Sequence, residues 1–183
     1  MLLSQGKVAE VQRRADYALK IVLQGSRNLQ DIALNHLSLG RAHLLQETFR
    51  VLETLKVCTT YLDRAVDGLR QAGQQQYMPL GFLARAELRR VTGELDKARR
   101  DLDEAFSIAT RGGMRLFEAD CHLAYARWYL ASVETLHATS LHAMSLPPET
   151  DKAGEHLAKA KQIIEQTGYH RRDGELQELE AQV

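Results

Sequence analysis

The chain has 183 residues, 44% hydrophobic and 26% charged, and its 24 basic side chains are balanced by 24 acidic ones. This length allows one domain or a short repeat array, and the three prolines favour a helix-rich protein. A net charge of zero creates no long-range field for nucleic acid or an anionic membrane, and no apolar run reaches the roughly 18 residues of a membrane span. We therefore expect no nucleic-acid and no membrane partner.

The first predicted element is a helix over residues 6–24. It begins at Gly6 and carries small or apolar residues 5, 9 and 12 positions after this glycine, which share one helix face. The same offsets recur after Gly93, and the same stripe occurs twice without the glycine, so we infer an internal repeat. The four stripes consist of Val11, Ala15 and Ala18; Ala65, Leu69 and Ala72; Ala98, Leu102 and Ala105; and Ala153, Leu157 and Ala160. Small residues on a packing face indicate a closely approaching second helix.

The segment 29–73 is predicted to be a repeat with an insert. A helix over 31–45 carries Gly40 at its close-packing position, and the striped helix with Ala65 follows. Between them, residues 47–62 have the character of a helix rather than of a loop. We therefore expect lengthened helices here.

In the segment 78–111 the close-packing residues of the two helices are separated by fewer residues than in the other repeats. Ala86 and Ala98 are separated by 12 residues, with Gly93 as the turn between two helices. This arrangement resembles the tetratricopeptide repeat, a helix–turn–helix unit of roughly 34 residues with small residues at the close crossing. Arg85 and Arg89 depart from the family, which tends to have Leu and Tyr there. The matching residues are Phe82, Ala86, Gly93, Leu95, Ala98, Leu102 and Ala105.

The segment 115–167 is a third predicted repeat, with Ala126 at the close crossing and a second insert. Residues 132–146 are expected to continue the preceding helix until Pro147 and Pro148 end it. If the stripe with Leu136 and Met144 is left bare, a second copy of the chain could dock there, making a homo-oligomer. The alternative is that the insert packs within the chain.

A short helix over 173–182, N-capped by Asp173, is expected to close the array. The resemblance implies an all-α fold, a right-handed α-solenoid of antiparallel helix pairs in which two pairs have lengthened helices. The single array 1–183 starts on the second helix of a repeat, so we expect it to belong to a longer array or to receive the missing helix from elsewhere. The repeat pattern of the sequence resembles that of the C-terminal repeat regions of bacterial signalling P-loop NTPases.

Candidate chemistry is sparse in this sequence. His36 and His43 could share a helix face but lack a third ligand, and adjacent Cys121 and His122 diverge on a helix. We therefore predict no metal, no cofactor and no catalytic residue. Paired acids such as Asp101 and Asp103 are expected on solvated surfaces. The two cysteines, Cys58 and Cys121, form no CxxC motif and no signal peptide is evident, which favours burial of both thiols and a cytoplasmic location.

The remaining candidate is a surface groove. In a tetratricopeptide-like array the first helices line the concave side, where a groove with an apolar floor and alternating charge suits a peptide or helix. We therefore predict a non-catalytic scaffold or sensor module for a protein or peptide partner. The alternatives for the chain are an accessory domain that positions a separate NTPase or effector enzyme, or a self-association module. The alternative for the groove is that its arginines do not bind a partner and are only solvated or paired with Glu87. The candidate groove residues are Leu37, Arg41, Leu44, Leu83, Glu87, Arg90, Leu123, Arg127 and Leu130.

Overall fold

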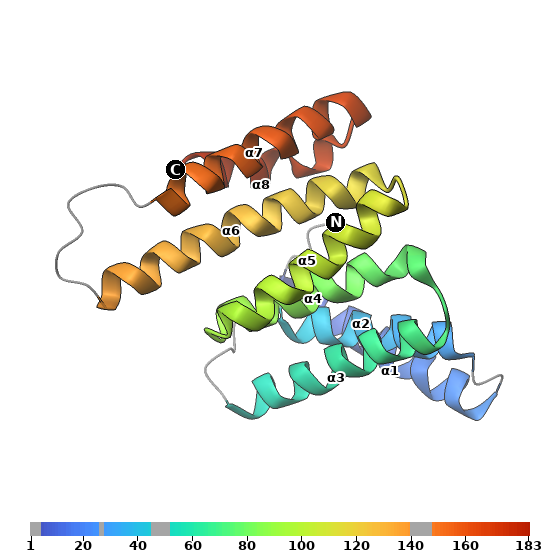
Figure 1. The fold of residues 1–183 in the computed structure, drawn as a ribbon. Coiled ribbons are helices and arrows are strands. Elements are labelled where there is room, and N and C mark those ends of the chain that lie inside the picture. Colours follow the sequence, from blue (N-terminus) through green and yellow to red (C-terminus); the bar gives the residue numbers. More distant parts are fainter. Residues whose placement is uncertain (1–4, 26–27, 45–51, 140–147) are drawn as a thin grey trace. The chain divides into compact units, whose positions relative to one another are not determined.

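The computed structural model describes residues 5–25, 28–44, 52–139 and 148–183. Over these residues the chain has eight α-helices, two short 3-10 helices and no strand (Figure 1). The expected all-α class is therefore confirmed. Tertiary contacts divide the chain into two compact units, residues 1–88 and 89–183.

The first unit contains α1 (Gln5–Gln24), α2 (Leu29–Leu44), α3 (Leu52–Gln71), η1 (Gln75–Tyr77) and most of α4 (Met78–Val91). Helix α2 packs against both α1 and α3. One buried cluster joins α2, α3 and α4, and its members are Leu37, Cys58, Leu62, Ala65, Ala84 and Leu88.

Glycines allow α2 and α3 to approach closely. A Cβ added at Gly40 would lie 2.5 Å from Leu62 Cδ2, and one added at Gly68 would lie 2.9 Å from the Ala33 Cβ. Since real Cβ atoms do not come that close to other heavy atoms, any larger residue would force a shift. The small residue that the sequence places at position 40 thus lies at a close helix crossing, as expected.

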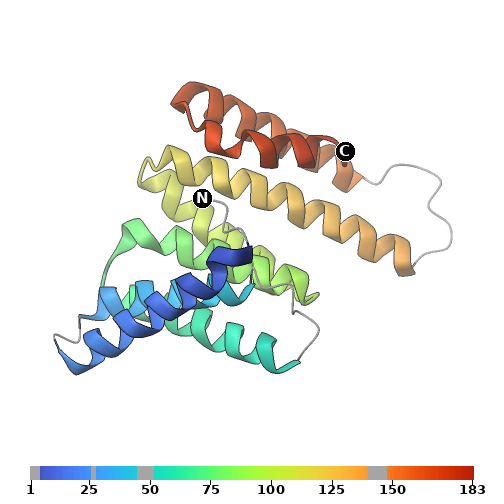
Figure 2. The ribbon, with the colours of Figure 1, turned by 180° about the vertical axis from the view of Figure 1, so that it is seen from behind.

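The second unit contains the end of α4, α5 (Leu95–Arg111), α6 (Arg115–Thr139), α7 (Pro148–Thr167), η2 (His170–Arg172) and α8 (Asp173–Glu180). Helix α6 packs against α5 and α7, and Figures 1 and 2 show α6 and α7 side by side and antiparallel. Their shared core also takes in α8. Its buried members are Ala119, Leu123, Ala126, Tyr129, Ala153, Leu157, Ala160, Ile163, Ile164, Tyr169, Leu176 and Leu179.

The small-residue stripes are buried as predicted in α5 and α7. Ala98 and Ala105 have no exposed surface and Leu102 is 2% exposed, and the α7 stripe lies in the core of the second unit. In α3 the stripe is buried at its first two positions, whereas in α1 only Ala15 is buried. The prediction therefore fits least well at the start of the chain.

The turn predicted at Gly93 is confirmed. Gly93 has φ 79°, a conformation that costs a glycine little, and it ends α4. Its N–H donates to the Arg90 carbonyl at 3.1 Å, and the Glu94 N–H donates to the Arg89 carbonyl at 2.7 Å. These two bonds form a Schellman motif, which satisfies carbonyls that the helix end would otherwise leave unpaired.

The two inserts are helical as far as they are described. Helix α3 begins at Leu52, and α6 continues to Thr139, a length of 25 residues. The rest of each insert lies outside the described residues. The helices fall within a few residues of the predicted segments 6–24, 29–73, 78–111, 115–167 and 173–182. Their grouping into repeats of a single array stays a prediction.

The expected N-cap of the last helix was wrong. The N-cap of α8 is Arg172, without a side-chain capping bond, and Asp173 is the first helical residue. The reason is that η2 runs directly into α8, so Asp173 has helical backbone angles rather than the extended ones of a capping residue. Its carboxylate lies 3.1 Å from His170 Nδ1 and, in the first turn, still complements the helix dipole.

Candidate functional site

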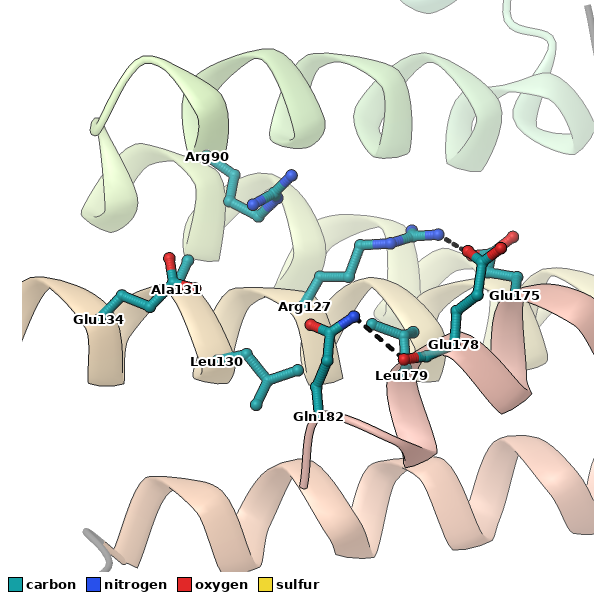
Figure 3. Close-up of a pocket in the computed structure, with 9 residues that line it drawn as sticks. All are labelled: Arg90, Arg127, Leu130, Ala131, Glu134, Glu175, Glu178, Leu179 and Gln182. Carbon is teal, nitrogen blue, oxygen red and sulfur yellow. Dashed lines mark hydrogen bonds and ion pairs between the residues drawn. The ribbon is translucent and has the colours of Figure 1, made fainter.

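The described part of the second unit has an open pocket with a volume of about 220 Å³. The end of α4 supplies Arg90, and one face of α6 supplies Arg127, Leu130, Ala131 and Glu134 (Figure 3). The rest of the lining comes from α8 and the turn after it, and consists of Glu175, Glu178, Leu179 and Gln182. The pocket therefore joins three segments that are distant in the sequence.

The pocket is lined by two leucines and five charged residues. Leu179 is buried and Leu130 half-buried, whereas the charged side chains are two arginines and three glutamates. Arg127 forms an ion pair with Glu175, drawn as a dashed line in Figure 3. Gln182 Nε2 donates to the Glu178 backbone carbonyl at 3.0 Å, which fixes the turn after α8.

A polar network anchors α8 beside the pocket. Arg172 Nε donates to Asp120 Oδ1 of α6 at 2.7 Å, and Arg172 also pairs with Glu175 at 2.7 Å. The Tyr169 hydroxyl donates to the other oxygen of Asp120 at 3.2 Å. Burial alone would lower the pKa of Arg172, but Asp120 and Glu175 outweigh it and raise the pKa, so the guanidinium stays charged. Ion pairs with both Arg127 and Arg172 thus fix the position of Glu175 in the pocket.

The structure brings three predicted groove residues together. Arg90, Arg127 and Leu130 all line the pocket, and the partner of Arg127 is Glu175 rather than Glu87. Glu175 was not predicted, because it is 48 residues away from Arg127 and only the docking of α8 on α6 brings the two together.

The other predicted groove residues have different positions. Leu37 and Leu123 lie in the two hydrophobic cores, 4% and 0% exposed, so they are not available to a partner. The groove floor was therefore wrong at these two leucines: a leucine on a helix face looks the same in sequence whether a neighbouring helix covers it or not. In the first unit Arg41 is exposed, and three further residues are half-buried, namely Leu44, Leu83 and Glu87.

The residues predicted for self-association are not placed by the structure. Leu136 lies within α6, but its side chain is outside the described residues. Met144 is also outside them. Docking of a second copy at this stripe stays a prediction.

A second cluster of polar side chains lies between α6 and α7. His122 Nδ1 and His156 Nδ1 are 2.9 Å apart, and the rings of Phe106, Tyr125 and Tyr129 pack around them. Sequence reasoning missed this pair because the two histidines are 34 residues apart. Their register was the available signal, since His122 lies four residues before Ala126 and His156 three after Ala153, both beside buried small residues.

The two thiols are buried, and two further histidines of the first unit pack against an aromatic ring. Burial raises the pKa of the Cys58 thiol to about 11 and raises that of Cys121 still further, so neither is a ready nucleophile at neutral pH. The expected burial of both cysteines is confirmed. His36 and His43 each pack against Tyr61 at 5.6 Å between ring centroids.

One expectation for the acidic residues was wrong. Asp101 is 4% exposed and pairs with Arg89 at 2.6 Å, instead of lying on a solvated surface. The Asp101 carboxylate can be buried because the opposite charge of Arg89 meets it. Arg85 similarly pairs with Asp63 at 3.0 Å within the first unit.

Within the described residues, no group of three or more His, Cys, Asp or Glu side chains is placed to hold a metal ion. No described helix has both the length and the apolar character that crossing a bilayer requires. The chain matches no protein-family model, no curated protein and no solved structure.

Proposed function

We propose that the chain is a non-catalytic protein-interaction module and that the pocket of the second unit contacts a segment of its partner. The observation that carries this proposal is the gathering of Arg90, Arg127 and Leu130 around one open pocket. These residues come from two helices for which the sequence pattern predicted a partner-binding face.

The size and lining of the pocket favour a peptide segment over a small molecule. A volume of about 220 Å³ is below the roughly 300–1,000 Å³ of pockets that enclose drug-sized ligands, and it suits one or two side chains of a larger partner. Half-buried Leu130 offers an apolar contact, while Glu134 and Glu178 are exposed at the rim. The partner segment would therefore present an apolar residue next to a basic one.

The state of the two thiols and of the paired imidazoles supports the non-catalytic part of the proposal. Both thiols have raised pKa values, and the paired imidazoles lie among aromatic rings. The resemblance to tetratricopeptide repeats adds that the module would act as a scaffold or sensor region of a signalling protein. This part of the proposal rests on the resemblance.

The test is selection of binding peptides from a random 12-residue display library on the purified chain, followed by measurement of their affinities. Glu134→Lys with Glu178→Lys should weaken binding of selected basic peptides by about tenfold, since each rim charge is worth roughly 0.5–1 kcal/mol. Glu155→Lys with Glu165→Lys, exposed on α7, is the matched control and should leave affinity unchanged. Equal affinity for both double variants, or a failure to select any peptide, would contradict the proposal.

A further inference from the structure

The contact between α6 and α7 contains a direct bond between two imidazoles. His122 is 7% exposed and His156 half-buried, with their Nδ1 atoms 2.9 Å apart. A bond at this distance requires one Nδ1 to donate a proton and the other to accept it, so at least one imidazole must be neutral. When both rings are protonated, both Nδ1 atoms are donors and the bond is lost.

The surroundings of the pair do not accommodate a second positive charge. Three cations face it from three helices: Arg99 of α5, Arg115 of α6 and Lys159 of α7. Two carboxylates on these helices are already engaged. Asp103 of α5 accepts hydrogen bonds from Tyr125 at 2.7 Å and from Arg99 at 2.9 Å, and Glu118, one turn before His122 on α6, pairs with Arg115 at 2.5 Å. The other groups facing the pair are the rings of Phe106, Tyr125 and Tyr129. The Lys152 ammonium of α7 lies 5.7 Å from the centroid of the Tyr129 ring.

We propose that the His122–His156 pair is an acid-sensitive switch that holds α6 and α7 together when neutral and separates them when both imidazoles are protonated. The core beneath the pair includes Leu157 of α7 and Leu176 and Leu179 of α8. Separation of α6 from α7 would expose this core and take apart the neighbouring pocket. The switch does not depend on the pocket being a peptide site.

The pH window follows from linkage. Burial, together with the nearby cations, lowers the pKa of both imidazoles from 6.5 to about 4. Above pH 6.5 both the closed and the open form hold neutral imidazoles, whereas between pH 6.5 and about 4 only the open form takes up protons, so the closed form loses stability as the pH falls. At pH 5 this linkage favours opening by roughly 30-fold for each imidazole that is released.

Trp128 makes the opening of the second unit measurable. It is the single tryptophan of the chain, and its Nε1 donates to the Leu95 carbonyl at 2.8 Å. Urea unfolding followed by Trp128 fluorescence at pH 7.5, 6.5, 5.5 and 5.0 should show an unfolding constant that rises by at least 30-fold from the first pH to the last. His122→Phe with His156→Leu should remove most of this rise. His170→Gln, which changes a histidine that is 68% exposed, should behave as the wild type does.

A second measurement keeps the proposal testable if the double variant fails to fold. Imidazole proton resonances of the wild-type protein give the titration of each histidine directly. Two imidazoles that remain neutral down to about pH 5 support the switch. Titration of all the histidines near pH 6.5, or an unfolding constant with the same pH dependence in the wild type and the folded double variant, would overturn it.

Discussion

Replacement of Arg172 tests how firmly α8 is held on α6. Arg172→Met removes the cation from Asp120, whose side chain is 7% exposed, and leaves it the hydrogen bond from the Tyr169 hydroxyl. Removal of one member of a buried ion pair costs about 3–5 kcal/mol because the other charge stays buried. Since Arg172 itself is 29% exposed, solvent screening places the expected loss near the lower limit, at about 3 kcal/mol.

The loss can be measured by urea unfolding followed by Trp128 fluorescence. With a denaturant slope of about 2 kcal/mol per molar, 3 kcal/mol corresponds to a fall of about 1.5 M in the urea midpoint. Adding Asp120→Asn to the variant should recover at least about half of the loss, because a neutral amide leaves no buried charge while still accepting the Tyr169 hydrogen bond.

The matched control is an exposed ion pair from the same unit. Lys161 and Glu180 lie 3.2 Å apart with side chains 52% and 39% exposed. Lys161→Met should change stability by about 0.5 kcal/mol or less, as is usual for surface pairs. The reasoning would be refuted if Arg172→Met moved the midpoint no more than the control did, or if Asp120→Asn added to the loss instead of relieving it.

Two further predictions concern helix packing. Gly68→Ala should lower the melting temperature seen by circular dichroism, at a net cost of about 1 kcal/mol, because the new methyl would lie 2.9 Å from the Ala33 Cβ and outweigh the gain in helix propensity. Gly154→Ala, where the nearest atom is 3.6 Å away, should instead stabilise by about 0.5–1 kcal/mol, and the reverse order of the two variants would contradict the packing argument. Ala98→Leu should overpack a fully buried site and cost about 1–3 kcal/mol, whereas Ala158→Leu on the exposed face of α7 should cost little; equal melting temperatures would place the α5 stripe outside the core.

The local pattern of the sequence was sufficient for the helices, for the Gly93 turn and for the face that α5 and α7 bury. Helical periodicity places residues three and four positions apart on one face, so Ala98, Leu102 and Ala105 could be assigned to a packing stripe without knowledge of the neighbouring helix. The turn followed in the same way, because glycine has a lower cost than other residues in the left-handed conformation that ends a helix.

The polar contacts were decided by the tertiary structure alone. Asp120 and Arg172 are 52 residues apart and His122 and His156 are 34 apart, and no local periodicity connects positions on different helices. Which leucine becomes core and which lines a pocket was equally undetermined: Leu123 and Leu130 are one heptad apart on α6, yet the first is fully buried and the second half-exposed at the pocket. Burial depends on which helices cover each turn of α6, and that is a property of the packed unit rather than of any single segment.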